Sequence, residues 1–375
     1  MYGGIKVGTD GKTGTVLEVG KVAIIKYEKV DKFKTSVFYN VYKNAFDITQ
    51  EIINDNQIYQ QNYSQNTNGT NLRNSEQIYN IIFFTGDRGA GKTSAMLSYM
   101  EFLKDYYRNA NNPNKDIGEL VFSRRDIMFT GLEYIDASSL TSKEDILGSV
   151  LSKMLKKWKD EEKRSYGERG IRREDDYTYK KRQIHMRFNE VYENVKKLRS
   201  TKDVMETESD MFMETLESMS ITWNLQQSFQ HLVKEYLDVM EYPGSEKQIG
   251  RGNHFLVISI DDLDMNVESG FELMEQIRRY LMGPNVLVLL SANYEQLEKI
   301  CYNYYISKFE KAMKHSDMDT YCMRLSRDYL EKIIPVQRQV VLYSGGAWDY
   351  FGSKPLTIQY KMGETDSGPT EELLV

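Results

Sequence analysis

One glycine-rich segment has the residue types that surround a bound phosphate. Residues 86–93 read Gly-Asp-Arg-Gly-Ala-Gly-Lys-Thr and fit the pattern G-x-x-x-x-G-K-[ST]. Glycines let the backbone curve tightly and bring its N–H groups close to an anion. Lys92 adds a compact positive charge, and the Thr93 hydroxyl is a ligand for Mg²⁺. We therefore expect a nucleotide polyphosphate to be bound by Gly86, Asp87, Arg88, Gly89, Ala90, Gly91, Lys92, Thr93 and Ser94.

The sequence on either side of this segment has the pattern that a phosphate-binding loop requires. An apolar run over 78–84 is typical of a strand buried on both faces. Helical spacing of apolar residues follows from Ser94 to Tyr107, so the dipole of a helix N-terminus would face the anion. The alternative, a glycine-rich turn with an unrelated Lys-Thr pair, does not account for this context.

A second group with chemical potential is the acidic sequence after the apolar run 255–260. Asp261, Asp262 and Asp264 come directly after that run. Ligands bind at the carboxyl ends of strands in open α/β sheets, so carboxylates there can hold a metal or polarise a water. We assign Asp261 to Mg²⁺ and Asp262 to activation of the attacking water. The alternative is that these carboxylates cap the next helix, and this is the interpretation we favour for Asp264.

A third polar sequence, Ser291-Ala-Asn293, follows the next apolar run, 286–290. Asn293 is expected to orient the attacking water or to contact the terminal phosphate. Ser291 is a weaker candidate for the same role. The competing explanation is an asparagine that simply forms a turn.

These groups are separated by an alternation of strand and helix patterns. Strands are predicted over 78–84, 127–135, 255–260, 286–290 and 340–343, and helices over 33–55, 94–107, 144–158, 267–282, 294–315 and 319–334. A polar stretch over 54–76 is expected to be a loop. Such alternation predicts an α/β fold with a mostly parallel, five-stranded sheet flanked by helices.

The chain divides into five segments on this evidence. We expect an N-terminal glycine-rich segment, helix and polar loop (1–75), then the first half of a nucleotide-binding core (76–158). A charged helical insertion (159–250) precedes the second half of the core (251–343). The tail (344–375) would begin a lid or further domain of a longer protein.

Composition argues against several other classes of protein. The chain has 375 residues, a net charge of -6, two cysteines and four histidines. Two cysteines cannot build a disulfide framework, and no histidine stands at metal-ligand spacing from another histidine or cysteine. Without an apolar run of membrane-spanning length or a signal peptide, we expect a cytoplasmic protein with no membrane partner.

Four sequences together resemble the KAP branch of P-loop NTPases, relatives of the STAND and AAA+ ATPases of the additional-strand class. They are residues 84–93, Ile260-Asp-Asp-Leu-Asp264, residues 285–292 and Tyr329-Leu-Glu-Lys-Ile-Ile-Pro335. The resemblance covers 76–158 and 254–340 and leaves the charged insertion uncovered. Without membrane helices, the chain is most similar to soluble ATPase subunits of bacterial antiviral systems such as RADAR.

The resemblance implies ATP hydrolysis with Mg²⁺ and a sheet in which the loop-bearing strand lies beside the strand 286–290. It also implies a homo-oligomeric ring, in which a basic residue of a neighbouring subunit completes each site. Arg327 and Lys332 are the candidates we select, with Arg324 and Arg338 as further ones and Arg278 and Arg279 as weaker ones. An effector such as an adenosine deaminase is the expected partner in defence against phage.

Two other functions stay open at this point. The Lys- and Arg-rich segment 153–200 motivates a nucleic-acid-dependent ATPase, although its many interspersed acidic residues favour a solvated helix. Alternatively, bound ATP could order an interface for partner proteins with little turnover. The sequence has no guanine-reading motif, so ATP is preferred to GTP only through the resemblance.

Overall fold

The computed structural model describes a central β-sheet with its flanking helices and most of the helical insertion. The described residues are 33, 36, 38–65, 78–112, 120–140, 145–168, 174–202, 208–240, 252–309, 318–342, 357–359 and 372–374. The first residue of the predicted helix 144–158 lies outside these ranges. Most of the predicted tail does too.

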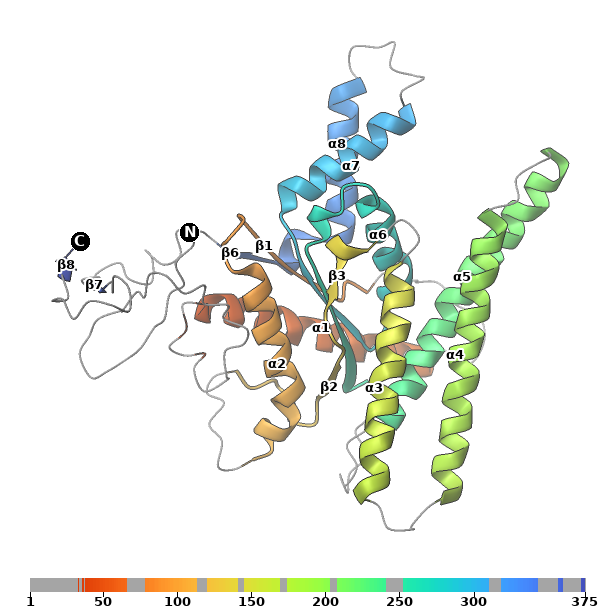
Figure 1. Ribbon diagram of the computed structural model, residues 1–375, viewed down its shortest axis with the longest axis horizontal. Helices are drawn as coiled ribbons and strands as arrows, with labels where there is room; N and C mark the ends of the chain where they lie inside the picture. Colours follow the sequence, from red (N-terminus) through yellow and green to blue (C-terminus); the bar gives the residue numbers. More distant parts are fainter. Residues whose placement is uncertain are drawn as a thin grey trace, which may run out of the picture.

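The centre of the molecule is a parallel β-sheet (Figure 1). Its strand order is β2-β4-β5-β1-β6, with β3 paired to β4 beyond the end of β2. The strands are β1 (Ile81–Gly86), β2 (Met128–Gly131), β3 (Ile135–Asp136), β4 (His254–Asp261), β5 (Val286–Ser291) and β6 (Gln339–Leu342). Every strand pair in this sheet is parallel. β1 lies between β5 and β6, so the strand predicted over 286–290 is its neighbour, as expected.

The described sheet has six strands, so the prediction of five was wrong. The predicted strand over 127–135 is two short strands, β2 and β3, that pair with different parts of β4. Glu133 and Tyr134 between them are both exposed. Two consecutive exposed residues break the alternation of a regular strand, so the chain leaves the sheet and then rejoins it.

Alternate residues of the central strands feed two separate hydrophobic clusters. In β1, Ile81 and Phe83 belong to one cluster, and Ile82 and Phe84 belong to the other. Because successive side chains of a strand point to opposite faces, the sheet is buried on both sides. The protein is therefore a three-layer α/β/α structure.

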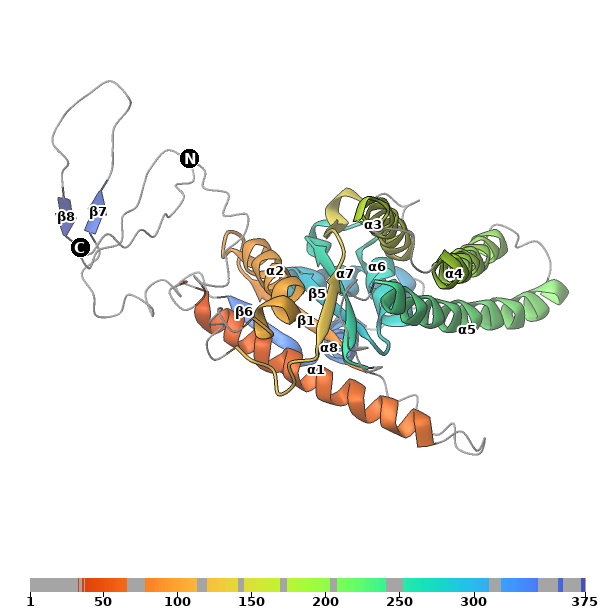
Figure 2. The same ribbon diagram turned by 90° about the horizontal axis from the view of Figure 1, so that it is seen from below.

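Helices α1 (Tyr39–Gln65) and α2 (Lys92–Ala110) cover one face of the sheet. Figure 2 shows α1 lying on the opposite side of the sheet from α3 (Ile146–Glu168), α4 (Glu174–Lys202) and α5 (Glu208–Val239). A buried hydrogen bond of 2.6 Å joins Thr49 of α1 to Tyr99 of α2. At the start of β6, Arg338 bonds to Glu51 and Asp55 of α1, each at 2.8 Å.

The structure overturns the predicted boundary between helix and loop in the N-terminal region. We expected a loop over 54–76, but α1 continues to Gln65. Polar side chains bind this part of the helix to the sheet: Asn56 donates to the Gly252 carbonyl at 3.0 Å, and Gln60 donates to Asn285 at 2.9 Å. The polar composition of the segment predicted a loop. In the structure these polar side chains instead stabilise the helix, because residues next to the strands accept their hydrogen bonds.

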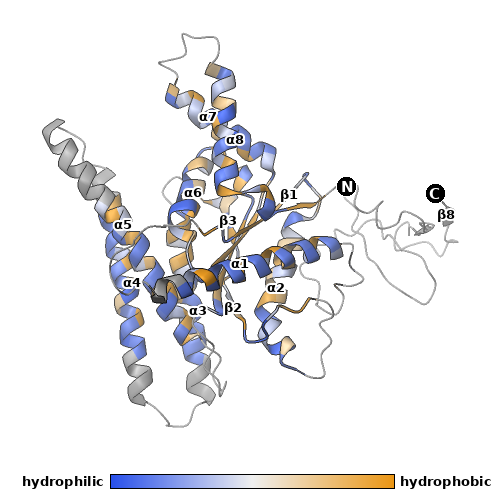
Figure 3. Cartoon of the chain, turned by 180° about the vertical axis from the view of Figure 1, so that it is seen from behind, coloured by the Kyte–Doolittle hydropathy of each residue, from blue (hydrophilic) through white to orange (hydrophobic). Residues whose placement is uncertain are grey.

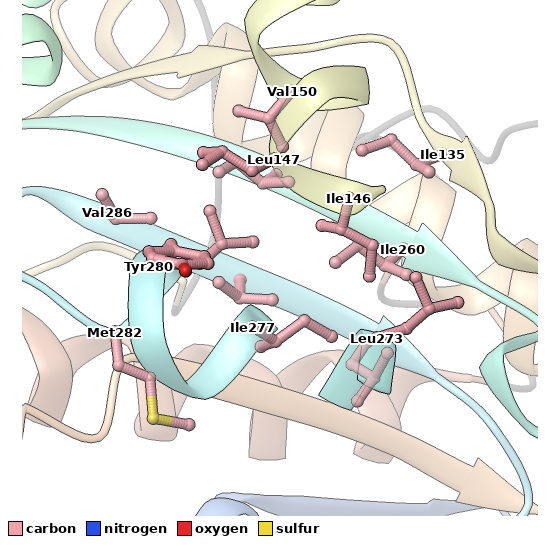
Figure 4. Packing of buried hydrophobic residues seen from close by; sticks show 14 of the residues in the cluster. Ile135, Ile146, Leu147, Val150, Ile260, Leu273, Ile277, Tyr280, Met282 and Val286 are labelled. Carbon is pink, nitrogen blue, oxygen red and sulfur yellow. The ribbon is translucent and has the colours of Figure 1, made fainter. Parts of the chain in front are cut away.

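The other face of the sheet is covered by α3, α5, α6, α7 and α8. Figure 4 shows Ile146, Leu147 and Val150 of α3 packed beside the sheet. Their neighbours in this cluster are Ile135 of β3, Ile260 of β4, Leu273, Ile277 and Tyr280. The elements are α3 (Ile146–Glu168), α6 (Gly270–Gln276), a π-helical turn η4 (Ile277–Leu281), α7 (Tyr294–Phe309) and α8 (Met318–Ile333). The predicted helix over 267–282 therefore begins three residues later and changes to π-helix at Ile277.

The charged insertion consists of the end of α3 with α4 (Glu174–Lys202) and α5 (Glu208–Val239). Figure 3 shows that many described residues of these helices are hydrophilic, with hydrophobic residues between them. Arg187 of α4 bonds to Glu235 of α5 at 2.9 Å, and the buried Trp158 of α3 contacts the His185 and Phe188 rings of α4. The predicted helical character of this region is confirmed in the described residues.

Three short 3-10 turns and two short strands complete the described elements. They are η2 (Ala137–Ser139), η3 (Leu263–Met265), η6 (Val336–Arg338) and the antiparallel pair β7 (Thr357–Gln359) and β8 (Glu372–Leu374). Among the residues that the structure describes, no helix combines the length and apolar character needed to span a lipid bilayer.

Candidate functional site

The glycine-rich loop connects the end of β1 to the start of α2. Gly86 ends β1, and Gly91 is the residue immediately before α2 begins at Lys92. Gly89 and Gly91 have φ angles of 86° and 89°, in the left-handed region that glycine adopts without steric cost. The sequence pattern thus forms a tight turn from strand to helix, and the backbone N–H groups at the start of α2 have no earlier helical turn to bond.

Two of the glycines are also required by close neighbours. A Cβ at Gly91 would lie 2.5 Å from a ring carbon of Phe38, and a Cβ at Gly86 would lie 2.2 Å from the Leu342 carbonyl oxygen. By contrast, a Cβ at Gly89 would meet no atom within 4 Å from the rest of the described residues, apart from its two chain neighbours. The loop is therefore held between Phe38, at the start of α1, and the end of β6.

The Lys92 ammonium lies against the backbone of the loop. Its Nζ donates to the carbonyl oxygens of Gly86 and Asp87 at 3.0 and 3.1 Å. Asp87, Arg88 and Gly89 are exposed, so the tip of the loop faces solvent. The ammonium is thus positioned at the loop by groups that an anion could replace.

Thr93 and Asp261 connect the glycine-rich loop to the acidic strand end. The Thr93 hydroxyl donates to Asp261 Oδ1 at 3.1 Å. Asp261 is the last residue of β4 and is only 5% exposed. The two groups that the sequence pointed to separately are therefore adjacent. A hydroxyl and a carboxylate are both hard oxygen ligands, the donor set that suits Mg²⁺.

Burial raises the pKa of Asp261, and Asp136 adds to the increase by repulsion. Hydrogen bonds from Thr93 and from the Asp262 backbone oppose it. The pKa of Asp262 is also raised, first by burial and then by the charges of Asp261, Asp264 and Asp136, with Lys92 opposing. The site therefore concentrates negative charge that a cation would neutralise.

Asp262 adopts a backbone conformation that is unusual for its residue type. Its φ and ψ angles are 52° and 37°, the left-handed region, and it precedes the 3-10 turn η3. Such conformations cost energy in residues other than glycine, although asparagine and aspartate tolerate them best. The strand thus ends abruptly at Asp261, and Asp262 stays half-buried beside it.

The predicted capping role of Asp264 was wrong. Asp264 lies within η3, whereas the residue before α6 is Ser269. It is 8% exposed, and its Oδ1 has no hydrogen-bond partner among the described residues. The sequence alone could not distinguish a cap from this position, because the 3-10 turn delays the helix by several residues.

Asp136 is a site residue that the sequence analysis did not identify. It ends β3, and it is the direct register partner of Asp261 on β4. Its Oδ1 accepts hydrogen bonds from the Ser138 backbone N–H at 3.0 Å and the Ser138 hydroxyl at 2.6 Å. The available signal was an aspartate at the end of a predicted strand, the same feature that identified Asp261.

Ser291 and Asn293 both lie near the site but differ in their partners. Ser291 ends β5, is fully buried, and lies close enough to lower the pKa of Asp261. Its Oγ nevertheless has no hydrogen-bond partner of normal geometry among the described residues. The Asn293 side chain donates to the Gly86 carbonyl at 3.3 Å and accepts from the Gln296 N–H at 3.0 Å, so it also caps α7.

The candidate basic residues have different surroundings. Arg327 is 61% exposed and bonds to Glu298 at 2.5 Å, and Lys332 is exposed with no ion pair to a described residue. Arg338 is 7% exposed and bound by two carboxylates of α1, so it cannot reach a neighbouring molecule. Arg278 and Arg279 both bond to Glu275, and Arg324 lies over the Tyr321 ring.

No cluster of three or more His, Cys, Asp or Glu side chains that could hold a metal occurs in the described part of the chain. Comparison with models of known protein families and with curated proteins found no family and no curated relative that matches this sequence.

Proposed function

We propose that this protein is a P-loop ATPase of the additional-strand class that binds and hydrolyses Mg-ATP. The observation that carries the proposal is the 3.1 Å hydrogen bond between Thr93 of the glycine-rich loop and Asp261 of β4. The position of β5 between β1 and β4 and the positive φ angles of Gly89 and Gly91 support it. No general requirement of an α/β fold brings these particular side chains together.

In this proposal each side chain has a separate task. The backbone of residues 86–94 and the Lys92 ammonium hold the phosphates. Thr93 and Asp261 would hold Mg²⁺, which neutralises charge on the phosphates. Asp262 accepts a hydrogen bond from the attacking water, and Asn293, which already contacts Gly86, is close to the loop. Ser291 joins this set because its buried hydroxyl lacks a partner among the described residues.

We further propose that the ATPase works as a homo-oligomeric ring in which a neighbour supplies Arg327 or Lys332. Both side chains are exposed and near the end of α8. In related reactions such a residue raises the rate of hydrolysis by a factor of about 10³–10⁵. The ring would act as a switch or motor for an effector such as an adenosine deaminase in defence against phage. This part of the proposal rests on the resemblance of the four sequence motifs alone.

The central test is ATP hydrolysis by the purified protein and by a Lys92→Ala variant. We expect ATP turnover that depends on Mg²⁺ and is lost in the variant. The loop has two positive side chains, and the variant keeps only Arg88. A Lys43→Ala variant is the control, since Lys43 is an exposed lysine of α1. Equal ATPase rates in the protein and in Lys92→Ala would refute the proposal.

The role of a neighbouring subunit can be tested by mixing two inactive variants. Lys92→Ala would disable the subunit that binds ATP, and Arg327→Ala would disable the subunit that supplies the basic residue. Mixed rings should recover activity, because some interfaces combine an intact loop with an intact arginine. If mixtures of Lys92→Ala with either Arg327→Ala or Lys332→Ala stay inactive, neither residue acts across an interface.

The alternative of a nucleic-acid-dependent ATPase receives little support from the basic segment 153–200. Several of its basic side chains already pair with carboxylates: Lys156 with Glu133, Lys181 with Glu162, and Arg187 with Glu190 and Glu235. Stimulation of ATP turnover by DNA or RNA would favour that alternative. ATP binding without turnover in the assembled protein would instead favour the ATP-bound scaffold.

A further inference from the structure

The start of α1 places an aromatic ring directly against the glycine-rich loop. Phe38 contacts Gly91 so closely that a Cβ on the glycine would overlap the ring, at 2.5 Å from one ring carbon and 3.2 Å from another. Phe38 is separated from Gly91 by more than fifty residues in the sequence. Nothing in the loop motif requires an aromatic residue at this place, so the contact needs its own explanation.

The ring is only half-buried, unlike the aromatic residues around it. Its neighbours Phe33 and Tyr42 are 1% and 0% exposed, and they stack on each other with ring centres 4.0 Å apart. Phe38 meets Tyr42 edge-on, with ring centres 6.3 Å apart. Part of Phe38 therefore stays open to solvent beside the loop, while its neighbours form the core beneath it.

The position of Phe38 is held by a well-connected backbone. Its N–H donates to the Ser36 hydroxyl at 3.0 Å, and its carbonyl accepts from the Tyr42 N–H at 2.9 Å. Farther along α1, the Thr49–Tyr99 hydrogen bond ties the helix to α2, which begins at the loop. The ring and the loop are thus connected through α1 and α2.

We propose that Phe38 is the platform on which the base of a bound nucleotide stacks, and that the site therefore prefers purine to pyrimidine nucleoside triphosphates. A partly exposed aromatic ring beside a loop that would hold phosphates is suited to stack on a base. A purine offers a larger flat surface than a pyrimidine. This inference rests on the proposed function, because it places the base of the same nucleotide whose phosphates the loop holds.

The test compares ligands that have the same phosphates with and without a base. Binding of Mg-ATP, Mg-CTP and inorganic tripolyphosphate is measured by calorimetry for the protein and for Phe38→Leu and Phe38→Trp. Phe38→Leu should weaken ATP binding roughly 5- to 100-fold, the usual effect of losing one base–aromatic stack, and should leave tripolyphosphate binding unchanged. Phe38→Trp should retain the preference for ATP over CTP.

Val41→Ala is the matched control, because Val41 packs against the same hydrophobic cluster from the first turns of α1. It should leave the ATP affinity unchanged. Thermal unfolding of each variant shows whether the loop is still supported. If Phe38→Leu does not fold, Phe38→Tyr replaces it as a second variant and should bind ATP normally.

Three outcomes would overturn the inference: ATP binding unchanged in Phe38→Leu, equal weakening of ATP and tripolyphosphate, or no preference for ATP over CTP in the unaltered protein. The second would mean that Phe38 only supports the loop. Each of these leaves the proposed ATPase intact, provided that the unaltered protein binds ATP and Lys92→Ala does not. Failure of the unaltered protein to bind either ATP or tripolyphosphate would instead refute the proposed function itself.

Discussion

Asp136 and Asp261 are direct register partners at the ends of the parallel strands β3 and β4. The pairing brings together two carboxylates that are more than a hundred residues apart in the sequence. Each belongs to a strand that ends at the edge where the glycine-rich loop also lies, since Asp261 accepts the Thr93 hydroxyl hydrogen bond. The acidic side of the candidate site is thus built from two strands, and not from the β4 sequence alone.

The two carboxylates should differ in their effect on magnesium dependence. Asp261→Asn is expected to raise the Mg²⁺ concentration needed for half-maximal turnover by at least tenfold, because the residue pairs with Thr93 at the loop. Asp136→Asn should have a smaller effect, since one oxygen of the Asp136 carboxylate already accepts two hydrogen bonds from Ser138. Titration of ATPase activity with Mg²⁺ measures both. An effect of Asp136→Asn larger than that of Asp261→Asn would contradict this assignment.

Asp262→Asn should separate nucleotide binding from hydrolysis. The change keeps the size of the side chain and its tolerance of the left-handed backbone conformation. We expect turnover to fall about 10²–10⁴-fold, the usual contribution of a group that handles the water's proton, with ATP affinity nearly unchanged. Calorimetry and steady-state ATPase assays on the same preparation provide the measurement. Retention of more than a tenth of the turnover would exclude Asp262 from this role.

Gly91→Ala and Gly89→Ala form a matched pair of loop variants. Both glycines have positive φ angles, so each alanine should cost about 1–2 kcal/mol of backbone strain. Only at Gly91 would the new methyl group also meet Phe38. Gly91→Ala should therefore lose more stability in urea denaturation and more ATP affinity than Gly89→Ala. Equal losses in the two variants would mean that the Phe38 contact is easily displaced.

Arg338 and Arg327 should respond differently to removal. Arg338→Met is expected to lower the free energy of unfolding by about 1–3 kcal/mol, because the buried guanidinium bonds to two carboxylates of α1. Arg327→Ala should stay within about 0.5 kcal/mol, since the side chain is largely exposed. Denaturant unfolding of both variants measures the difference. A destabilising Arg327→Ala would assign that arginine a structural role.

His254 should make the fold less stable in mild acid. Burial lowers the pKa of His254 from 6.5 to about 4, and the ring bonds to Thr130 at 2.8 Å. Between these two pH values the unfolded chain binds the proton and the folded protein does not. Stability is therefore complete above about pH 6.5 and falls as the pH is lowered toward 4, by about 3 kcal/mol at most.

A His254→Gln variant is the control for this pH dependence. Glutamine keeps a hydrogen-bonding side chain but cannot be protonated in this range. The other titrating groups are the same in both proteins, so they cancel when the two unfolding free energies are subtracted. The remaining difference should shrink as the pH falls from 6.5 to 4. A constant difference across this range would show that His254 does not contribute.

Features that depend on local spacing can be predicted from the residue pattern. The loop pattern of residues 86–93 places Lys92 and Thr93 at the start of a helix, and the apolar runs predict strands buried on both faces. These predictions hold because strand and helix periodicity act over a few residues. The aspartate at the end of β4 was also found in this way, since the end of an apolar run is visible in the sequence.

Contacts between residues far apart in the chain depend on the packing of whole elements. The register of β3 beside β4 brings Asp136 to Asp261, and the sheet supplies partners that keep the polar end of α1 helical. The sequence makes Arg338 a candidate for contact with a neighbouring subunit, but packing against α1 buries it. Such pairings depend on packing between elements far apart in the chain, whose free energy no local pattern contains. Local residue types therefore specify the chemistry that is available here, and long-range packing selects which groups share one site.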